Sequence, residues 1–252
     1  MRLTKQYGNF DHYYVIIPDL HFRKSLMHAI VRQYEHLGIK HLAKLCGYNT
    51  DNQWDYIKNV YSIHKTFEFL ERLCDSLHLA LSYEFCAYLL ESKQIDAKTI
   101  FELNNDSLVK VLPLLKNFIE KCYAQDQVFQ KNIDLLNIIE TIVSHYTAER
   151  SRNWDLRTAA LKESIHFAMI SNCTQYGPLL VELLFHQFSF QERYLDLMRE
   201  GFFTHKLRNT DKSAFVGNDA VIEDVNLLAG QFRHKRQTLE QAINQSNSID
   251  VL

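Results

Sequence analysis

The chain has 252 residues, 46% hydrophobic and 23% charged, so it is long enough to bury a substantial core. Its 28 basic and 30 acidic residues give no global positive field, so any contact with nucleic acid would need a local basic patch. Five scattered cysteines without a CxxC pair support neither a zinc site nor a disulfide framework, and no run of about 18 apolar residues predicts a membrane span. We expect an intracellular globular protein.

The first predicted element is a short strand over Tyr13–Ile17, a continuous run of aromatic and β-branched residues. Asp19 follows near its carboxyl end, with His21 two residues further on, and a helix is expected next, up to Gly38. A lone strand cannot satisfy its own backbone hydrogen bonds. We therefore expect it to pair with the aromatic segment near Phe202 or with residues outside this chain.

From Gly38 to Gly201 apolar residues recur every three or four positions, which predicts helices almost without interruption. Asp51, Asp106 and Asp126 are candidate helix starts, as is either Asn153 or Asp155, and Pro113 predicts a kink or a late start in one helix. The expected fold class is mainly α, a large helical bundle with one or two short buried strands, near Tyr13–Ile17 and Phe202–Leu207.

The stretch 202–228 departs from this pattern. After Gly201 comes a short aromatic segment, then a polar basic loop, and Asn218-Asp219 predicts the start of a new helix. Asp219 and Glu223 are four residues apart and would lie on one face of its first turn. Two interpretations stay open: acids favoured at the positive end of an ordinary helix, or carboxylates with a chemical role.

The nucleotide-binding glycine loops, the HExxH zinc motif and the GxSxG nucleophile motif are absent from the sequence. Basic residues gather late in the chain, in the loop and near the C-terminus, as Arg208, Lys212, Arg233, Lys235 and Arg236. They form either a solvated surface or a set of contacts to nucleic-acid phosphates.

The succession of several short motifs resembles an uncharacterised eukaryotic domain family of transposon-derived proteins. Its members carry a GDQ segment, a strand ending in D-x-H, a W-x-L tract, an N-Y motif and a late D-x-x-x-E-x-x-N helix. The matching residues here are Asp19, His21, Trp154, Leu156, Tyr176, Asp219, Glu223 and Asn226. Each motif is weak alone, and the resemblance depends on their order over nearly the whole chain.

The resemblance suggests to us a partial RNase H-like transposase core with a helical insertion. Asp19 and Glu223 would be catalytic carboxylates and ligands of Mg²⁺ ions, with His21, Asp219 and Asn226 supporting the metal or contacting phosphate. The implied division is 1–37 as a strand-helix remnant of the core, 38–201 as the insertion, and 202–252 as a strand-loop-helix return with a basic tail.

The chain also departs from the family. It has no GDQ motif, so the first carboxylate is missing, and Pro178 replaces the usual arginine after the N-Y motif. We expect either a part of a longer gene product or a descendant retained for binding.

Two functions follow: a non-catalytic helical module that binds protein or nucleic acid, which we favour, and the C-terminal part of a two-metal nuclease. DNA and protein are both open as partners, a membrane is not expected, and DNA binding would imply a nuclear location.

Overall fold

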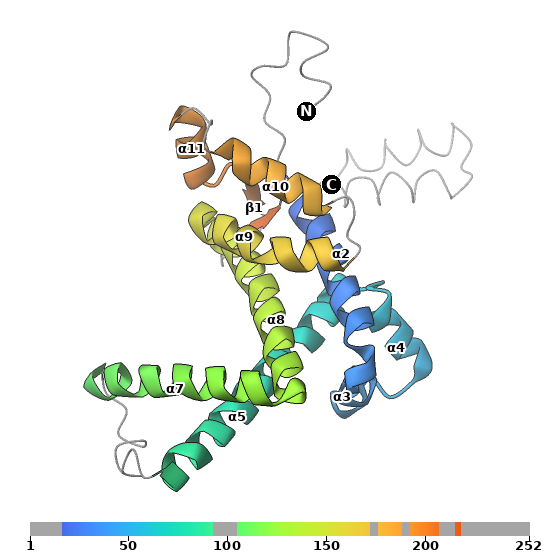
Figure 1. The fold of residues 1–252 in the computed structure, drawn as a ribbon. Coiled ribbons are helices and arrows are strands. Elements are labelled where there is room, and N and C mark those ends of the chain that lie inside the picture. The colour runs from blue at the N-terminus through green and yellow to red at the C-terminus, as the bar shows by residue number, and fades with distance from the viewer. Residues whose placement is uncertain (1–16, 93–104, 172–175, 188–191, 207–214, 218–252) are drawn as a thin grey trace, which may run out of the picture.

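The structure, a computed structural model, describes residues 17–92, 105–171, 176–187, 192–206 and 215–217 (Figure 1). This part of the chain is mainly helical, as the sequence predicts. The elements are α2 (Asp19–Gln33), η1 (Glu35–Leu37), α3 (Ile39–Leu45), α4 (Asp51–Lys58), α5 (Ile63–Ser92), α7 (Asn105–Gln125), α8 (Gln127–Ser151), α9 (Trp154–Ile170), α10 (Tyr176–Gln187), α11 (Glu192–Arg199), β1 (Thr204–Lys206) and β2 (Phe215–Gly217).

The two strands form a small antiparallel sheet in which His205 lies opposite Val216. β1 falls within Phe202–Leu207, and within the described residues its partner is β2. Of the earlier predicted strand, only Ile17 is described, and it belongs to neither a helix nor a strand. The RNase H-like core therefore stays a prediction.

Helix α2 begins at Asp19, whereas the sequence predicted its start after Asp19 and His21. Pro18 occupies the N-cap position with a φ of -68°, and its carbonyl accepts a hydrogen bond from the backbone N–H of Phe22 at 2.9 Å. Asp19 and His21 therefore lie in the first turn of α2 and not ahead of the helix. A proline at the helix start and an acid at its positive end both favour this start.

Other helix boundaries follow local capping chemistry. Asp126 caps α8 and Asn153 caps α9, each by accepting backbone hydrogen bonds with its side chain. For α4 the cap is Thr50, one residue before the predicted Asp51, because Thr50 and Gln53 form a reciprocal capping box. Helix α7 continues through Pro113.

The main core of the described residues surrounds α8, which packs against α2, α5, α7 and α9 (Figure 1). It includes fully buried side chains from segments distant in sequence, such as Met27, Ile57, Leu70, Ile139 and Leu161. Helix α2 thus shares one core with the middle of the chain. We call this part the body.

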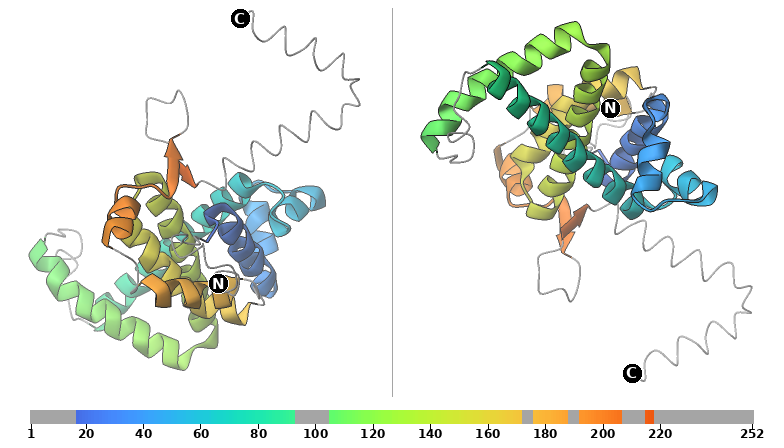
Figure 2. Two further views of the ribbon diagram at one scale, coloured as in Figure 1. Left: turned by 90° about the horizontal axis from the view of Figure 1, so that it is seen from above. Right: turned by 90° about the horizontal axis from the view of Figure 1, so that it is seen from below.

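A second, smaller core lies apart from the body. Phe85 and Leu89 of α5 pack with Phe118 of α7, supported by half-buried apolar neighbours. Figures 1 and 2 show the end of α5 and the first part of α7 extending away from the other helices, while the end of α7 meets α8. We call residues 79–92 together with α7 the arm. Leu81 of α5 packs against both cores, and Phe129 of α8 also packs against the second one.

Candidate functional site

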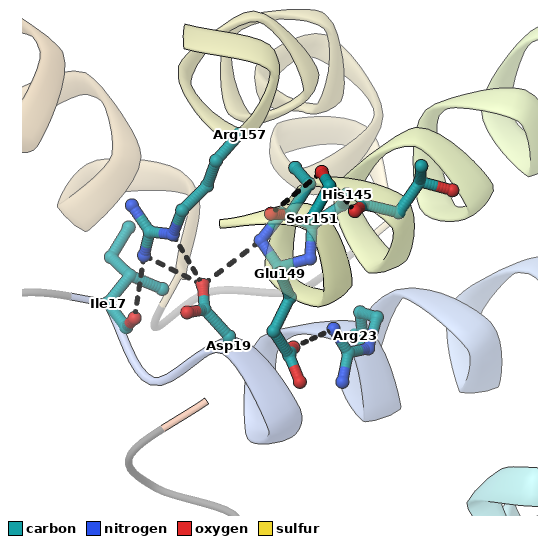
Figure 3. Close-up of polar contacts among 9 residues, drawn as sticks. Ile17, Asp19, Arg23, His145, Glu149, Ser151 and Arg157 are labelled. Carbon is teal, nitrogen blue, oxygen red and sulfur yellow. Dashed lines mark hydrogen bonds and ion pairs between the residues drawn. The ribbon is translucent and has the colours of Figure 1, made fainter. Parts of the chain in front are cut away.

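Asp19 is the one predicted metal ligand that the structure describes, and it is buried with 3% of its side chain exposed. Its Oδ1 atom accepts a hydrogen bond from Nε of Arg157 at 2.8 Å and lies 2.7 Å from a second guanidinium nitrogen (Figure 3). The same guanidinium donates to the backbone carbonyl of Ile17 at 3.1 Å. Arg157 therefore ties the start of α2 to α9.

His145, on α8, approaches the same carboxylate oxygen. Its Nε2 lies 3.1 Å from Oδ1 of Asp19, an ion-pair distance, although the ring is not aligned for a good hydrogen bond. Its Nδ1 has no hydrogen-bond partner among the described residues. The ring is 2% exposed and packs edge-on against Phe22 at 5.7 Å between centroids. Three helices, α2, α8 and α9, thus meet at Asp19.

Aromatic rings enclose the guanidinium of Arg157. Its central carbon lies 5.0 Å from the ring centre of Trp154 and 5.5 Å from that of Phe203. These two rings pack together in a small cluster with Met198. Cation–π attraction partly replaces the water that Arg157 loses on burial.

A second buried ion pair lies beside the first. Arg23 of α2 donates a hydrogen bond to Glu149 of α8, and both side chains are almost fully buried (Figure 3). The ring of Tyr146 lies 5.2 Å from the Arg23 guanidinium carbon. With His145 neutral, the two arginines balance the two carboxylates. We call Asp19, Arg23, His145, Glu149 and Arg157 the Asp19 cluster.

The titration of the cluster follows from these contacts. Burial opposes ionisation of Asp19, but the charge of Arg157, and after it His145, outweighs burial and holds the pKa of Asp19 well below its usual range. Burial lowers the pKa of His145, and the positive charges of Arg23 and Arg157 add to this against the opposing effect of Asp19. Near neutral pH we therefore expect an ionised Asp19 and a neutral His145.

These surroundings do not suit a divalent cation. A Mg²⁺ ion bound to Asp19 would lie beside Arg157 and close to Arg23, so it would have to displace one cation while being repelled by the other. Within the described ranges, no three His, Cys, Asp or Glu side chains are grouped to hold a metal. Glu223, Asp219 and Asn226 lie outside the described residues, so the predicted pairing of Asp19 with Glu223 stays a prediction.

Of the other predicted site residues, one is described by the structure and the rest are not. His21 lies in the first turn of α2 and is exposed. The predicted phosphate contacts Arg208, Lys212, Arg233, Lys235 and Arg236 lie outside the described residues. Sequence reasoning missed Arg157, His145, Arg23 and Glu149, although each is a charged or titratable residue at helical spacing from core positions.

Two surface hollows of the described part lie away from Asp19. These adjoining hollows of about 330 and 430 Å³ lie along α8 and α9 and share Asn137, Thr141 and Glu163. Their linings include the carboxylates of Asp134 and Glu140 but no lysine or arginine. Neither hollow is lined by Asp19 or His145, and their charge does not favour nucleic-acid phosphates.

Comparison of the chain with protein-family models, with curated proteins and with solved structures found no match. The resemblance to transposon-derived proteins therefore stays a prediction. None of the helices in the described ranges combines the length and apolar content that a membrane span requires.

Proposed function

We propose that this chain is a non-catalytic helical interaction module, descended from a transposon-derived protein. The observation that carries the proposal is the engagement of Asp19. The carboxylate that a two-metal nuclease would offer to Mg²⁺ is used here to join α2 to Arg157 of α9 and His145 of α8. In this role Asp19 stabilises the fold.

Energetics support a structural role for Asp19. Removing one partner of a buried ion pair typically destabilises a protein by about 3 to 5 kcal/mol, because an unpaired charge remains buried. Binding Mg²⁺ at Asp19 would break the pair with Arg157 in this way. The ion would also have to lose part of its hydration shell, which Mg²⁺ gives up reluctantly.

A scaffold without a reaction centre must act through its surface. In the described part, large apolar side chains remain exposed on the arm, among them Leu79, Tyr83 and Val109 at 73%, 74% and 71%. Such exposure on one projecting element is typical of a protein-binding surface. The basic residues after position 207 offer a separate contact for DNA, and a nuclear location would follow from that contact.

The test of the proposal is a cleavage assay with the full chain, using single- and double-stranded DNA with Mg²⁺ or Mn²⁺. We expect no metal-dependent cleavage by the wild type. Asp19→Asn should instead lower the melting temperature. The matched control is Asp155→Asn, because Asp155 is also a first-turn acid but is exposed, and this change should leave the melting temperature nearly unaltered.

The nuclease alternative makes the opposite prediction. Metal-dependent cleavage that disappears in both Asp19→Asn and Glu223→Gln, while Asp155→Asn retains it, would overturn our proposal. Circular dichroism of each variant verifies that the loss does not result from unfolding.

DNA binding is tested separately by fluorescence anisotropy at two salt concentrations. If the basic tail contacts phosphates, replacing Arg233, Lys235 and Arg236 by glutamine should weaken binding to all sequences alike and reduce its salt dependence. Equal binding by the wild type and this variant would assign DNA contact to another surface or to none.

A further inference from the structure

The outer face of α5 is apolar where the helix leaves the body. Leu79, Tyr83 and Leu90 are exposed to 73%, 74% and 52%. On another side of the same helix, about 90° to 130° around its axis, Phe85 and Leu89 are buried in the core of the arm. This segment is thus apolar on two sides, whereas a helix that packs on one neighbour carries a single apolar stripe.

The three exposed residues, together with the half-buried Cys86, follow the spacing of a helix-pairing surface. Leu79, Tyr83, Cys86 and Leu90 are separated by four, three and four positions, the alternation that forms the seam of a coiled coil. We call these four residues the outer seam.

The flanks of the outer seam are small and uncharged. Ala80, Ser82 and Ala87 lie beside it, and such residues let two helix backbones approach closely. Between Ser76 and Leu90 the acidic or basic side chains are those of His78 and Glu84, which on a regular helix point about 100° or more away from the seam.

We propose that the outer seam pairs with the outer seam of a second copy of this chain. This inference rests on the proposed function as an interaction module and names its partner. Charges beside a seam normally select an unlike helix or repel an identical one. Here alanine and serine occupy those places, so nothing repels a second copy. With a two-fold axis, the same four residues of each copy form the contact.

The two helices would run antiparallel, which also sets their dipoles in opposite directions. The axis passes near the middle of the seam, so Leu79 of one copy packs against Leu90 of the other, and Tyr83 packs against Cys86. The seam is about 16 Å long by the rise of an α-helix, and it buries less than the roughly 800 Å² per partner of a stable interface. We therefore expect a dissociation constant of about 10 µM.

The first test is sedimentation velocity of the full chain from about 1 to about 100 µM, which brackets that affinity. The wild type should shift from monomer to dimer. Leu79→Glu with Tyr83→Glu should stay monomeric throughout. The matched control is Leu45→Glu with Tyr61→Glu, whose parent side chains are exposed to 72% and 69% but lie on other elements, and it should dimerise like the wild type. A monomeric wild type, or equal behaviour of the two variants, would overturn the proposal.

The second test locates the contact. Helix pairs pack with axes about 8 to 10 Å apart, so a bismaleimide with a spacer of about 10 Å should join the two Cys86 thiols. Cys86 is free and half-buried, whereas burial raises the pKa of the Cys74 thiol to about 11 and makes it slow to react. Peptide mass spectrometry should find the Cys86–Cys86 link in wild type and not in Leu79→Glu with Tyr83→Glu.

The two proposals fail in different ways. A monomer without metal-dependent cleavage would remove the self-association and leave the non-catalytic role in place. Cleavage that depends on Asp19 and Glu223 would remove the non-catalytic role whatever the oligomeric state.

Discussion

The Asp19 cluster and the outer seam depart from the usual distribution of residues in opposite directions. The cluster buries two arginines and two carboxylates, each paired with an opposite charge. The seam leaves leucine and tyrosine side chains in water. Buried charges with partners inside the chain fix how its helices meet, whereas exposed apolar side chains indicate that their partner is another molecule.

The strongest test of this contrast is removal of a buried cation. Arg157→Met should lower the free energy of unfolding by about 3 to 5 kcal/mol, because Asp19 keeps its charge in a buried position. Urea denaturation measures the change. Arg72→Met is the control, since Arg72 forms an exposed pair with Glu68, and its loss should stay below about 1 kcal/mol. Equal losses would contradict the distinction between buried and exposed ion pairs.

The next test asks whether the arm has a core of its own. Phe118→Ala should destabilise the arm by about 3 kcal/mol by leaving a cavity beside Phe85 and Tyr88. Hydrogen exchange should accelerate in α7 and residues 79–92 and stay slow in α9. Equal acceleration across the body would show that the two cores unfold together.

The pH dependence of stability isolates His145. Its pKa is lowered in the folded state, so the unfolded chain binds the proton more readily, and stability should fall as pH drops below about 6.5. One such group contributes at most about 1.4 kcal/mol per pH unit. His145→Gln should flatten the pH dependence of the free energy of unfolding between about pH 7 and 5.5. Burial also lowers the pKa of His28, which is less buried, so His28→Gln measures how much of the pH dependence comes from that residue. An unchanged slope in His145→Gln would assign the effect elsewhere.

The smallest expected effect concerns the junction of arm and body. The hydroxyl of Tyr123 in α7 donates a hydrogen bond to Asp134 of α8 at 2.9 Å, at an exposed position. Tyr123→Phe should lower the free energy of unfolding by about 0.5 to 1.5 kcal/mol, which urea denaturation can resolve. Tyr61→Phe, at another exposed tyrosine, is the control and should have no effect.

Local chemistry made much of the fold predictable. Apolar spacing predicted helices from Gly38 to Gly201, where α5 lies, and Asp126 marked the start of α8 because its side chain can accept backbone N–H bonds. Thr50 was missed because Asp51, beside it, is an equally good capping type. The capping box with Gln53 separates them only when both partners are considered.

The Asp19 cluster was harder to predict, since its ion pairs join residues 126 and 138 positions apart. No local rule specifies such a partner. One indication was present: Arg157 lies three residues after Trp154 and four before Leu161, on the face that the apolar pattern assigns to the core. A charged residue on a core face predicts a buried partner of opposite charge, and Asp19 was the acid that the motif analysis had already singled out.

Helix α5 runs for 30 residues without interruption, about 45 Å by the helical rise, and the residues of its first half are fixed among those of the body. An uninterrupted helix of this length is stiff. If a bound molecule tilts its outer half, the first half must tilt with it, and Phe69 and Leu70 shift within the core of the body. Binding at the arm would therefore change the packing of the body.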